Sequence, residues 1–348
     1  MGNEITGARA KVGAKLSSTW GTAGTISTMD GMEVLNLAWN DSSERLQTTP
    51  IGSGDVGLGD VQRGPTSPGG SLEKVMHYND EGNAIIKSFF GAESVVAQQS
   101  TWAHSWTMNE SFNTSFTTLA HQVTTTSIIE YPTSAITRLG FSAATGDYVK
   151  MSCDALADQM KLTSQTNSFA ILSAANIANN ERVVCDASDE FLINVATGSA
   201  LATPTDRVNV STFAVEYSRE MQHVRECKGA AGNGEPIATG NPPFAWTVTI
   251  TIPRPQNIDF FHQLQQGTEF KAQFTVSGNT IANGIPTKVV WYFPRLKIID
   301  SPAYDFSSPG INPMTVKFEG LVASTIPTGF YDPYPYIVQV NNKSTWNT

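Results

Sequence analysis

The sequence predicts a mainly β protein, and three observations lead to that prediction. First, residues 244–252 alternate strictly between large apolar side chains and Ala or Thr. Because successive side chains of a strand point to opposite faces, such a run has one apolar and one polar face. Second, further runs rich in Thr, aromatic and β-branched residues are separated by glycine- and proline-rich connections. Third, only two short segments carry the spacing of an amphipathic helix.

The strand at 244–252 has a predicted partner at 212–221. The apolar face of that partner consists of Phe213, Val215, Tyr217 and Met221, and its opposite face of Ala214, Glu216, Ser218 and Glu220. The connection at 228–243 is much longer than a usual hairpin turn. A long loop on a well-patterned strand pair is usually functional or disordered, so this loop is the first candidate for activity.

The first half of the chain begins with a segment that we expect to be mostly irregular. Residues 1–70 contain one candidate strand at 33–39 and a glycine- and proline-rich loop or arm at 50–70. A short helix follows, with Asn83 as its N-cap and Gly91 as the residue that ends it. Further strands are predicted at 101–108, 111–119, 124–131, 136–143 and 148–154, the last two as a hairpin.

The second half is regular except at 155–206, where 169–172 and 191–195 are candidate strands. A second short helix is predicted at 257–267, and the residues from 327 onward are expected to form an extended arm. Further strands are predicted at 269–277, 288–299 and 313–321. The predicted fold is therefore a β-sandwich or barrel with two short helices, long loops and arms.

Composition narrows the class of protein. The 348 residues carry a formal charge of −9, which argues against sequence-independent DNA binding, because that binding needs Lys and Arg to displace phosphate counterions. The three cysteines are widely spaced and do not form a disulfide framework, so we expect a reducing compartment. The sequence contains no apolar run long enough to span a membrane, and we expect no membrane contact.

The motifs of enzymes and cofactor-binding proteins are weak or missing. Residues 52–57 match G-x-G-x-x-G, but no strand precedes the match and no helix pattern follows it, so we interpret it as a loop. The five histidines include no pair at ligand spacing, and no nucleophile elbow occurs. We therefore expect no enzyme activity, catalytic residue, metal or cofactor. A hydrolase whose triad meets only in space is the alternative that we rank last.

Three longer stretches carry a resemblance to a known family. They are the Gly-rich segment from 67 to the helix that ends at 91; residues 115–121 leading into 131–152; and 210–217, the long loop and 246–250, with 315–321 as the closing strand. Together they resemble the tail tube (major tail) proteins of bacteriophages with long, non-contractile tails. The resemblance extends over residues 10–325.

The resemblance implies a structural virion protein that assembles as hexameric rings. The rings would stack into a tube, and their strands would line a lumen through which DNA passes to the host without specific binding. The implied partners are further copies of the chain, the tape-measure protein and the tail-terminator protein. The implied location is the virion tail, with assembly in the host cytoplasm, and no catalysis, metal or cofactor is implied.

The resemblance also suggests candidate site residues. The loops would provide contacts between rings or subunits through Gly52, Gly54, Asp55, Gly229, Gly232, Asn233, Gly234, Glu235 and Pro236. The polar face of the strand at 244–252, formed by Thr247, Thr249 and Thr251, would line the lumen or pair with another sheet.

The domain organisation that we predict has three parts. An N-terminal arm with its Gly-rich loop covers 1–70, the β-rich core covers 71–325, and a C-terminal arm covers 326–348. Each half of the core holds a capped helix and a strand pair, which suggests a duplication, and 155–206 is a candidate outer subdomain. The alternative function is a β-sandwich module that binds a carbohydrate or receptor, with Trp20, Trp102 and Trp106 as candidate stacking residues.

Overall fold

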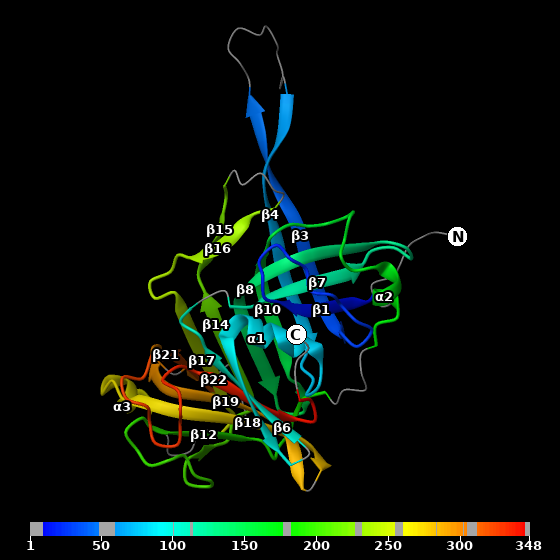
Figure 1. Cartoon of the computed structure of the whole chain (residues 1–348). Helices are drawn as coiled ribbons and strands as arrows, with labels where there is room; N and C mark the ends of the chain where they lie inside the picture. The colour runs from blue at the N-terminus through cyan, green and yellow to red at the C-terminus, as the bar shows by residue number, and fades with distance from the viewer. Residues whose placement is uncertain are drawn as a thin grey trace.

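The computed structural model describes residues 10–48, 60–99, 101–111, 114–176, 182–226, 232–254, 260–282, 284–301, 303–304 and 312–344. Most strands in these ranges join one large, curved antiparallel sheet that folds over a common core (Figure 1). The prediction of a mainly β, sandwich-type fold is confirmed.

The elements follow in chain order. The strands of the first half are β1 (Val12–Ser17), β2 (Gly31–Met32), β3 (Val34–Thr48), β4 (Asp60–Val75), β5 (Gly91–Gln98), β6 (Thr101–Met108), β7 (Phe116–Gln122), β8 (Ile128–Ala144), β9 (Asp147–Tyr148) and β10 (Lys150–Ala157). Those of the second half are β11 (Val184–Cys185), β12 (Glu190–Val195), β13 (Arg207–Val208), β14 (Thr212–Arg219), β15 (Met221–Val224), β16 (Gly234–Ala238), β17 (Phe244–Ile252), β18 (Glu269–Ala282), β19 (Ile285–Ile298), β20 (Ala303–Tyr304), β21 (Met314–Gly320) and β22 (Tyr336–Asn341). The helices are α1 (Ala84–Phe90), α2 (Phe169–Ser173) and α3 (Phe260–Gln265), with a 3-10 turn at Glu81–Asn83.

Two layers can be followed through the strand pairings. One layer has the order β4, β10, β8, β14, β17 and β21. The other has the order β5, β6, β22, β19, β18 and β12. The two layers join where the end of β19 pairs with β21. Because each layer has one apolar face, the layers bury those faces against each other.

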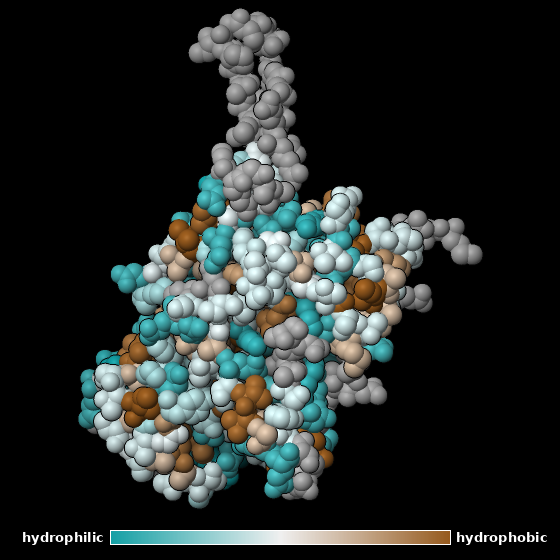
Figure 2. Space-filling view, in the orientation of Figure 1, coloured by the Kyte–Doolittle hydropathy of each residue, from teal (hydrophilic) through white to brown (hydrophobic). Residues whose placement is uncertain are grey.

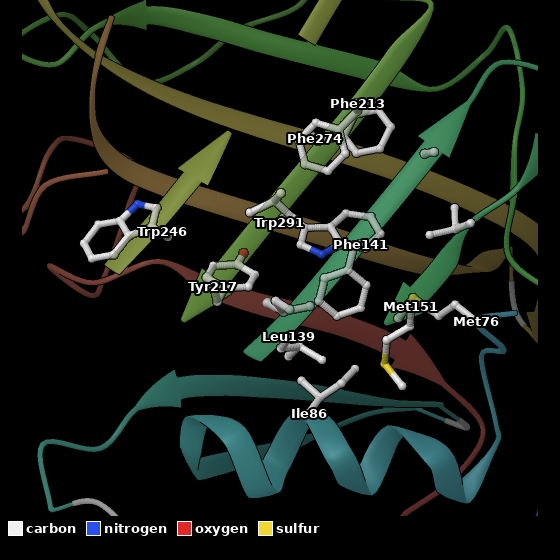
Figure 3. Packing of buried hydrophobic residues seen from close by; sticks show 14 of the residues in the cluster. Met76, Ile86, Leu139, Phe141, Met151, Phe213, Tyr217, Trp246, Phe274 and Trp291 are labelled. Carbon is white, nitrogen blue, oxygen red and sulfur yellow. The ribbon is translucent and has the colours of Figure 1, made fainter. Parts of the chain in front are cut away.

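Aromatic side chains fill the space between the layers (Figure 3). Phe213 and Phe274 stack with their ring centroids 4.2 Å apart, and Phe141 meets Trp291 edge-on at 5.5 Å. All five apolar side chains of β17 that the alternation assigned to the core are buried: Phe244, Trp246, Val248, Ile250 and Ile252. The sequence prediction for this strand is confirmed, both in its bounds and in its buried face.

Helix α1 closes one end of the core, and Ile86 points from it toward Leu139 (Figure 3). Its apolar residues occur in pairs four apart and are all buried, as the sequence predicts. Gly91 ends the helix with φ of 81°. The side chain of Asn83 does not cap the helix; instead its amide donates to the backbone oxygen of His77 at 2.8 Å.

Residues 1–70 differ most from the prediction, because most of their described part is strand rather than irregular chain. Strands β3 and β4 form a long hairpin that projects from the body (Figure 1). Gly70 has φ of 153°, and a Cβ on it would lie 2.1 Å from the backbone oxygen of Ala38. Only glycine lets the two strands pass this closely, so Gly69 and Gly70 belong to a strand and not to a loop. The part of the predicted loop at 50–59 lies outside the described residues.

Three other segments also differ from the prediction. Residues 169–172 belong to helix α2, which Ser168 caps by accepting from the backbone N–H of Ile171, so the candidate strand there is wrong. The strand predicted at 136–143 and the second half of the one predicted at 124–131 belong to a single strand, β8, which begins at Ile128. The last part of the predicted C-terminal arm contains β22, which is inserted between β19 and β6.

Helix α3 lies within the second predicted helix, and Gly267 follows it with φ of 64°. The N-cap proposed for that helix, Asn257, lies outside the described residues. Cys153 and Cys185 are buried, as expected for small apolar side chains, and Cys227 also lies outside the described residues. The division of the chain into arms, core and subdomain remains a prediction.

Candidate functional site

The sheet layer from β4 to β21 has a polar outer face. On its six strands the side chains that alternate with the core residues are small, polar or charged. They are Ser71, Glu73, Lys150, Ser152, Asp154, Arg138, Gly140, Ser142, Thr212, Ala214, Glu216, Ser218, Ala245, Thr247, Thr249, Thr251, Thr315, Lys317 and Glu319. We call this set the polar sheet face.

The strand register aligns the polar sheet face into rows. One row crosses all six strands through Glu73, Ser152, Gly140, Glu216, Thr247 and Glu319. Thr247, Thr249 and Thr251 are partly exposed on this face, so the sequence placed them on the correct side of their strand.

Two hollows lie in the polar sheet face. The larger one extends over β8, β14 and β17, and the other over β4, β8 and β10. Small side chains form much of their floor, and a Cβ on Gly140 would lie 2.7 Å from the hydroxyl of Ser152. Arg138 lines both hollows.

Carboxylates hold the guanidinium of Arg138. Its Nη2 donates to Oε2 of Glu216 at 2.6 Å, and its Nη1 lies 3.5 Å from Oδ2 of Asp154. The hydrogen bond and charge of Glu216, followed by the charge of Asp154, raise the pKa of Arg138 above its usual value. Elsewhere on the face, Nζ of Lys150 lies 3.8 Å from Oδ2 of Asp147.

Sequence reasoning did not find this group. The alternation placed Glu216 on the polar side of its strand, and Arg138 lies out of phase with the core residues Leu139 and Phe141. Those two signals predict the side of the sheet on which each residue lies. They do not predict that the strands pair with Ser218 opposite Arg138, which brings Glu216 within reach.

The predicted contact residues of the long loop are engaged mainly within their own chain. Asn233 is 8% exposed, and its backbone N–H donates to the backbone oxygen of Asp158 at 2.9 Å. Its side chain donates to the backbone oxygen of Thr66 at 3.3 Å, and its own backbone oxygen accepts from Nε1 of Trp20 at 2.9 Å. The contact with Thr66 joins the loop to β4 at the base of the β3–β4 hairpin, and the other two join it to the segments that follow β10 and β1.

The other predicted contact residues differ in their positions. Gly234 and Pro236 are buried in β16, Gly232 is partly buried, and Glu235 is exposed. Four more, Gly52, Gly54, Asp55 and Gly229, lie outside the described residues. Their role as contacts remains a prediction.

The tryptophans of the alternative binding function offer no open stacking platform. Trp106 is fully buried. Trp20 is half-buried, packs edge-on against Phe116 at 5.0 Å and donates its indole N–H to Asn233. Trp102 is also only partly exposed. On the visible side of the molecule, apolar residues occur as small separate patches within a polar surface (Figure 2).

Within the described ranges, His, Cys, Asp and Glu form no group of three that could hold a metal ion. Burial raises the pKa of the Cys153 thiol to about 12, which disfavours the reactive thiolate. Among the described helices, none has the length and apolar character that crossing a membrane requires.

The layers and the polar sheet face define an antiparallel β protein whose distinctive surface is a broad sheet face. Comparison with known proteins agrees with a structural role. The sequence model of a family described as phage tail tube protein matches residues 7–320, and the chain belongs to this family. No match was found among curated proteins. Membership supports a non-enzymatic, structural protein of the virion tail that self-assembles into a tube with other tail proteins.

Proposed function

We propose that the chain forms hexameric rings that stack into a tail tube and that the polar sheet face lines its lumen. One observation carries this proposal: six adjacent strands present small and polar side chains on one face while their other face is core. A face of this kind suits a wet channel. Closing such sheets around a ring also removes exposed sheet edges, which otherwise promote uncontrolled association.

In this proposal the channel delivers DNA without binding it specifically. Four carboxylates and three cations lie on the polar sheet face, the former at 73, 154, 216 and 319 and the latter at 138, 150 and 317. A face without excess positive charge gives no counterion-release gain to a DNA backbone. Thr247, Thr249 and Thr251 then line the channel with neutral hydroxyl groups.

The contacts between rings in this proposal involve the projecting β3–β4 hairpin and the loop beside it. Gly52, Gly54, Asp55, Gly229 and Glu235 are the candidates for direct contact, as a head-to-tail interface that propagates a filament. Asn233 supports the hairpin from within the same subunit. Gly232, Gly234 and Pro236 lie in the same loop and are further candidates for contact. Further partners in this proposal are the tape-measure and tail-terminator proteins, and assembly takes place in the host cytoplasm.

Electron microscopy combined with cysteine labelling tests the proposal. We expect purified protein to form rings with six subunits and tubes of uniform diameter. In a Cys227→Ser background, Ser142→Cys on the polar sheet face should react with a maleimide on a bulky polymer in subunits but be protected in tubes.

The matched control is Ser173→Cys on α2, an exposed serine outside the polar sheet face. It reports how much labelling is lost through tube formation in general. Equal labelling of Ser142→Cys in subunits and tubes would show that this face does not line the lumen. A protein that stays monomeric under all assembly conditions would contradict the tube itself.

A further inference from the structure

Arg138 is the one cation among the described residues that line the two hollows of the polar sheet face. It is on β8, with two strands of the layer on one side and three on the other. An arginine there is unexpected on a face that DNA passes. Its planar guanidinium binds phosphate oxygens through two parallel hydrogen bonds, which makes arginine a better phosphate ligand than lysine.

The carboxylates of Glu216 and Asp154 already occupy this guanidinium. Glu216 accepts a hydrogen bond at 2.6 Å, and Asp154 lies at 3.5 Å on the other terminal nitrogen. The three side chains are 50%, 48% and 43% exposed for Arg138, Glu216 and Asp154. The group is therefore open to a ligand in solution, and among the described residues Glu216 and Asp154 are the ones that form ion pairs with Arg138.

The surroundings of Arg138 leave room for an extended anion. Gly140, Ser142 and Ser152 line the hollow beside it, and the side chain of Arg138 remains 50% exposed. Of the other two cations of the face, Lys150 lies at the start of β10 opposite Ser142 and near Asp147, and Lys317 lies on β21, the last strand of the layer. A phosphodiester group moving over the face can thus approach Arg138 directly.

We propose that Glu216 and Asp154 are masking residues that prevent Arg138 from binding the phosphate groups of duplex DNA. The polar sheet face contains a phosphate site that the subunit fills with its own carboxylates. The contribution of this site to DNA passage rests on the proposed function, whereas the masking itself is a property of the subunit.

The masking does not need a strong ion pair. Exposed ion pairs contribute little to the free energy of unfolding, so these carboxylates have little effect on the stability of the fold. Tethered carboxylates are, however, present at high effective concentration beside the guanidinium, and a phosphate must displace them to bind. Replacing both acids by amides of the same shape removes this competition and leaves Arg138 available.

The test measures binding of a fluorescent DNA duplex to purified subunits by anisotropy at low salt. Asp154→Asn combined with Glu216→Gln should bind the duplex about tenfold more tightly than the native subunit. Because one more phosphate is neutralised, the logarithmic salt dependence should steepen by about one unit. Adding Arg138→Gln to this variant should return both values to those of the native subunit.

The matched control is Glu73→Gln combined with Glu319→Gln, which removes the same charge from the same face without touching Arg138. It should gain much less DNA binding. An equal gain in the control would show that net charge alone governs the effect and would overturn the proposal, as would no gain in the Asp154→Asn, Glu216→Gln subunit. Thermal melting of each variant confirms that the subunit is folded, since all the substituted acids lie on the surface layer.

The outcomes also separate this inference from the proposed function. If the masking variant gains DNA binding but Ser142→Cys is labelled equally in tubes and subunits, the masking stands and the lumen assignment fails. If Ser142→Cys is protected in tubes but the masking variant gains no binding, the lumen assignment stands and the masking fails.

Discussion

At the scale of single residues, the ion pair of Lys74 and Asp80 is closed off from water. Both side chains are 0% exposed, and Nζ of Lys74 lies 2.5 Å from Oδ2 of Asp80. The other carboxylate oxygen accepts from the backbone N–H of Gly82 at 2.6 Å. Burying two charges costs desolvation energy that their attraction only just repays, so the pair matters most when one partner is lost.

Lys74→Met should therefore destabilise the subunit by about 3–5 kcal/mol, because it leaves a buried carboxylate without its cation. Adding Asp80→Asn should restore most of this loss, since the amide oxygen can still accept from Gly82. Urea unfolding of the two variants and the native protein measures the free energies. A double variant as unstable as Lys74→Met alone would show that the loss of stability comes from altered packing and not from the unpaired charge of Asp80.

At the scale of elements, the β3–β4 hairpin depends on the loop that packs beside its base. In this loop, Asn233 forms hydrogen bonds with Asp158, Thr66 and Trp20. Among the described strands, β3 pairs with β4 alone, and β4 pairs with β10 only from Gly69 to Val75. A two-stranded ribbon is marginally stable by itself, so this support should fix its direction.

Asn233→Ala should weaken the support by about 1–2 kcal/mol, because it removes side-chain hydrogen bonds from a buried position. We expect faster amide exchange at 64–72, a nearly unchanged melting temperature and slower tube formation. Glu235→Ala is the matched control for amide exchange and melting temperature only, because Glu235 is the exposed neighbour in the same loop and is itself a candidate ring contact. If Asn233→Ala has the same amide exchange and the same rate of tube formation as the native protein, the hairpin does not need this contact.

At the scale of the whole molecule, the sequence predicts those elements whose partners bury only one face. Strands 101–108 and 244–252 agree to the residue with the prediction, the first from its run of Thr, Ser and aromatic residues and the second from its strict alternation. Helix α1 was predicted because its apolar pairs are four apart and Gly91 follows them. These signals are local and need no knowledge of the partner strands.

The elements and contacts that the sequence does not predict depend on segments that are distant in the chain. β22 was missed because its polar residues Gln339 and Asn341 are fully buried and donate to the backbone oxygen of Tyr78, so the strand does not alternate. β4 was missed because its glycines pack against backbone and not against side chains. The ion pair between Arg138 and Glu216 depends on a register across 78 positions of sequence, which no local pattern contains.

The loss of stability of the whole subunit at low pH should depend on three histidines. Burial lowers the pKa of His77, His121 and His223 below the usual histidine value. For His77 the charges of Asp80 and Glu33 act in the opposite direction and that of Lys74 in the same one, while Arg225 adds to the lowering at His223. The folded state therefore binds protons more weakly than the unfolded chain at these positions.

Lowering the pH from about 7.5 to 5 takes the solution through the unfolded histidine pKa, so the unfolded chain gains protons first and stability should fall. His121→Phe should flatten this decline, because an aromatic ring can keep the stack on Tyr131 without a titrating group. Melting temperatures measured at intervals across this range test the expectation, with the values at pH 7.5 as the reference. A variant that loses stability as steeply as the native subunit would assign the acid sensitivity to other groups.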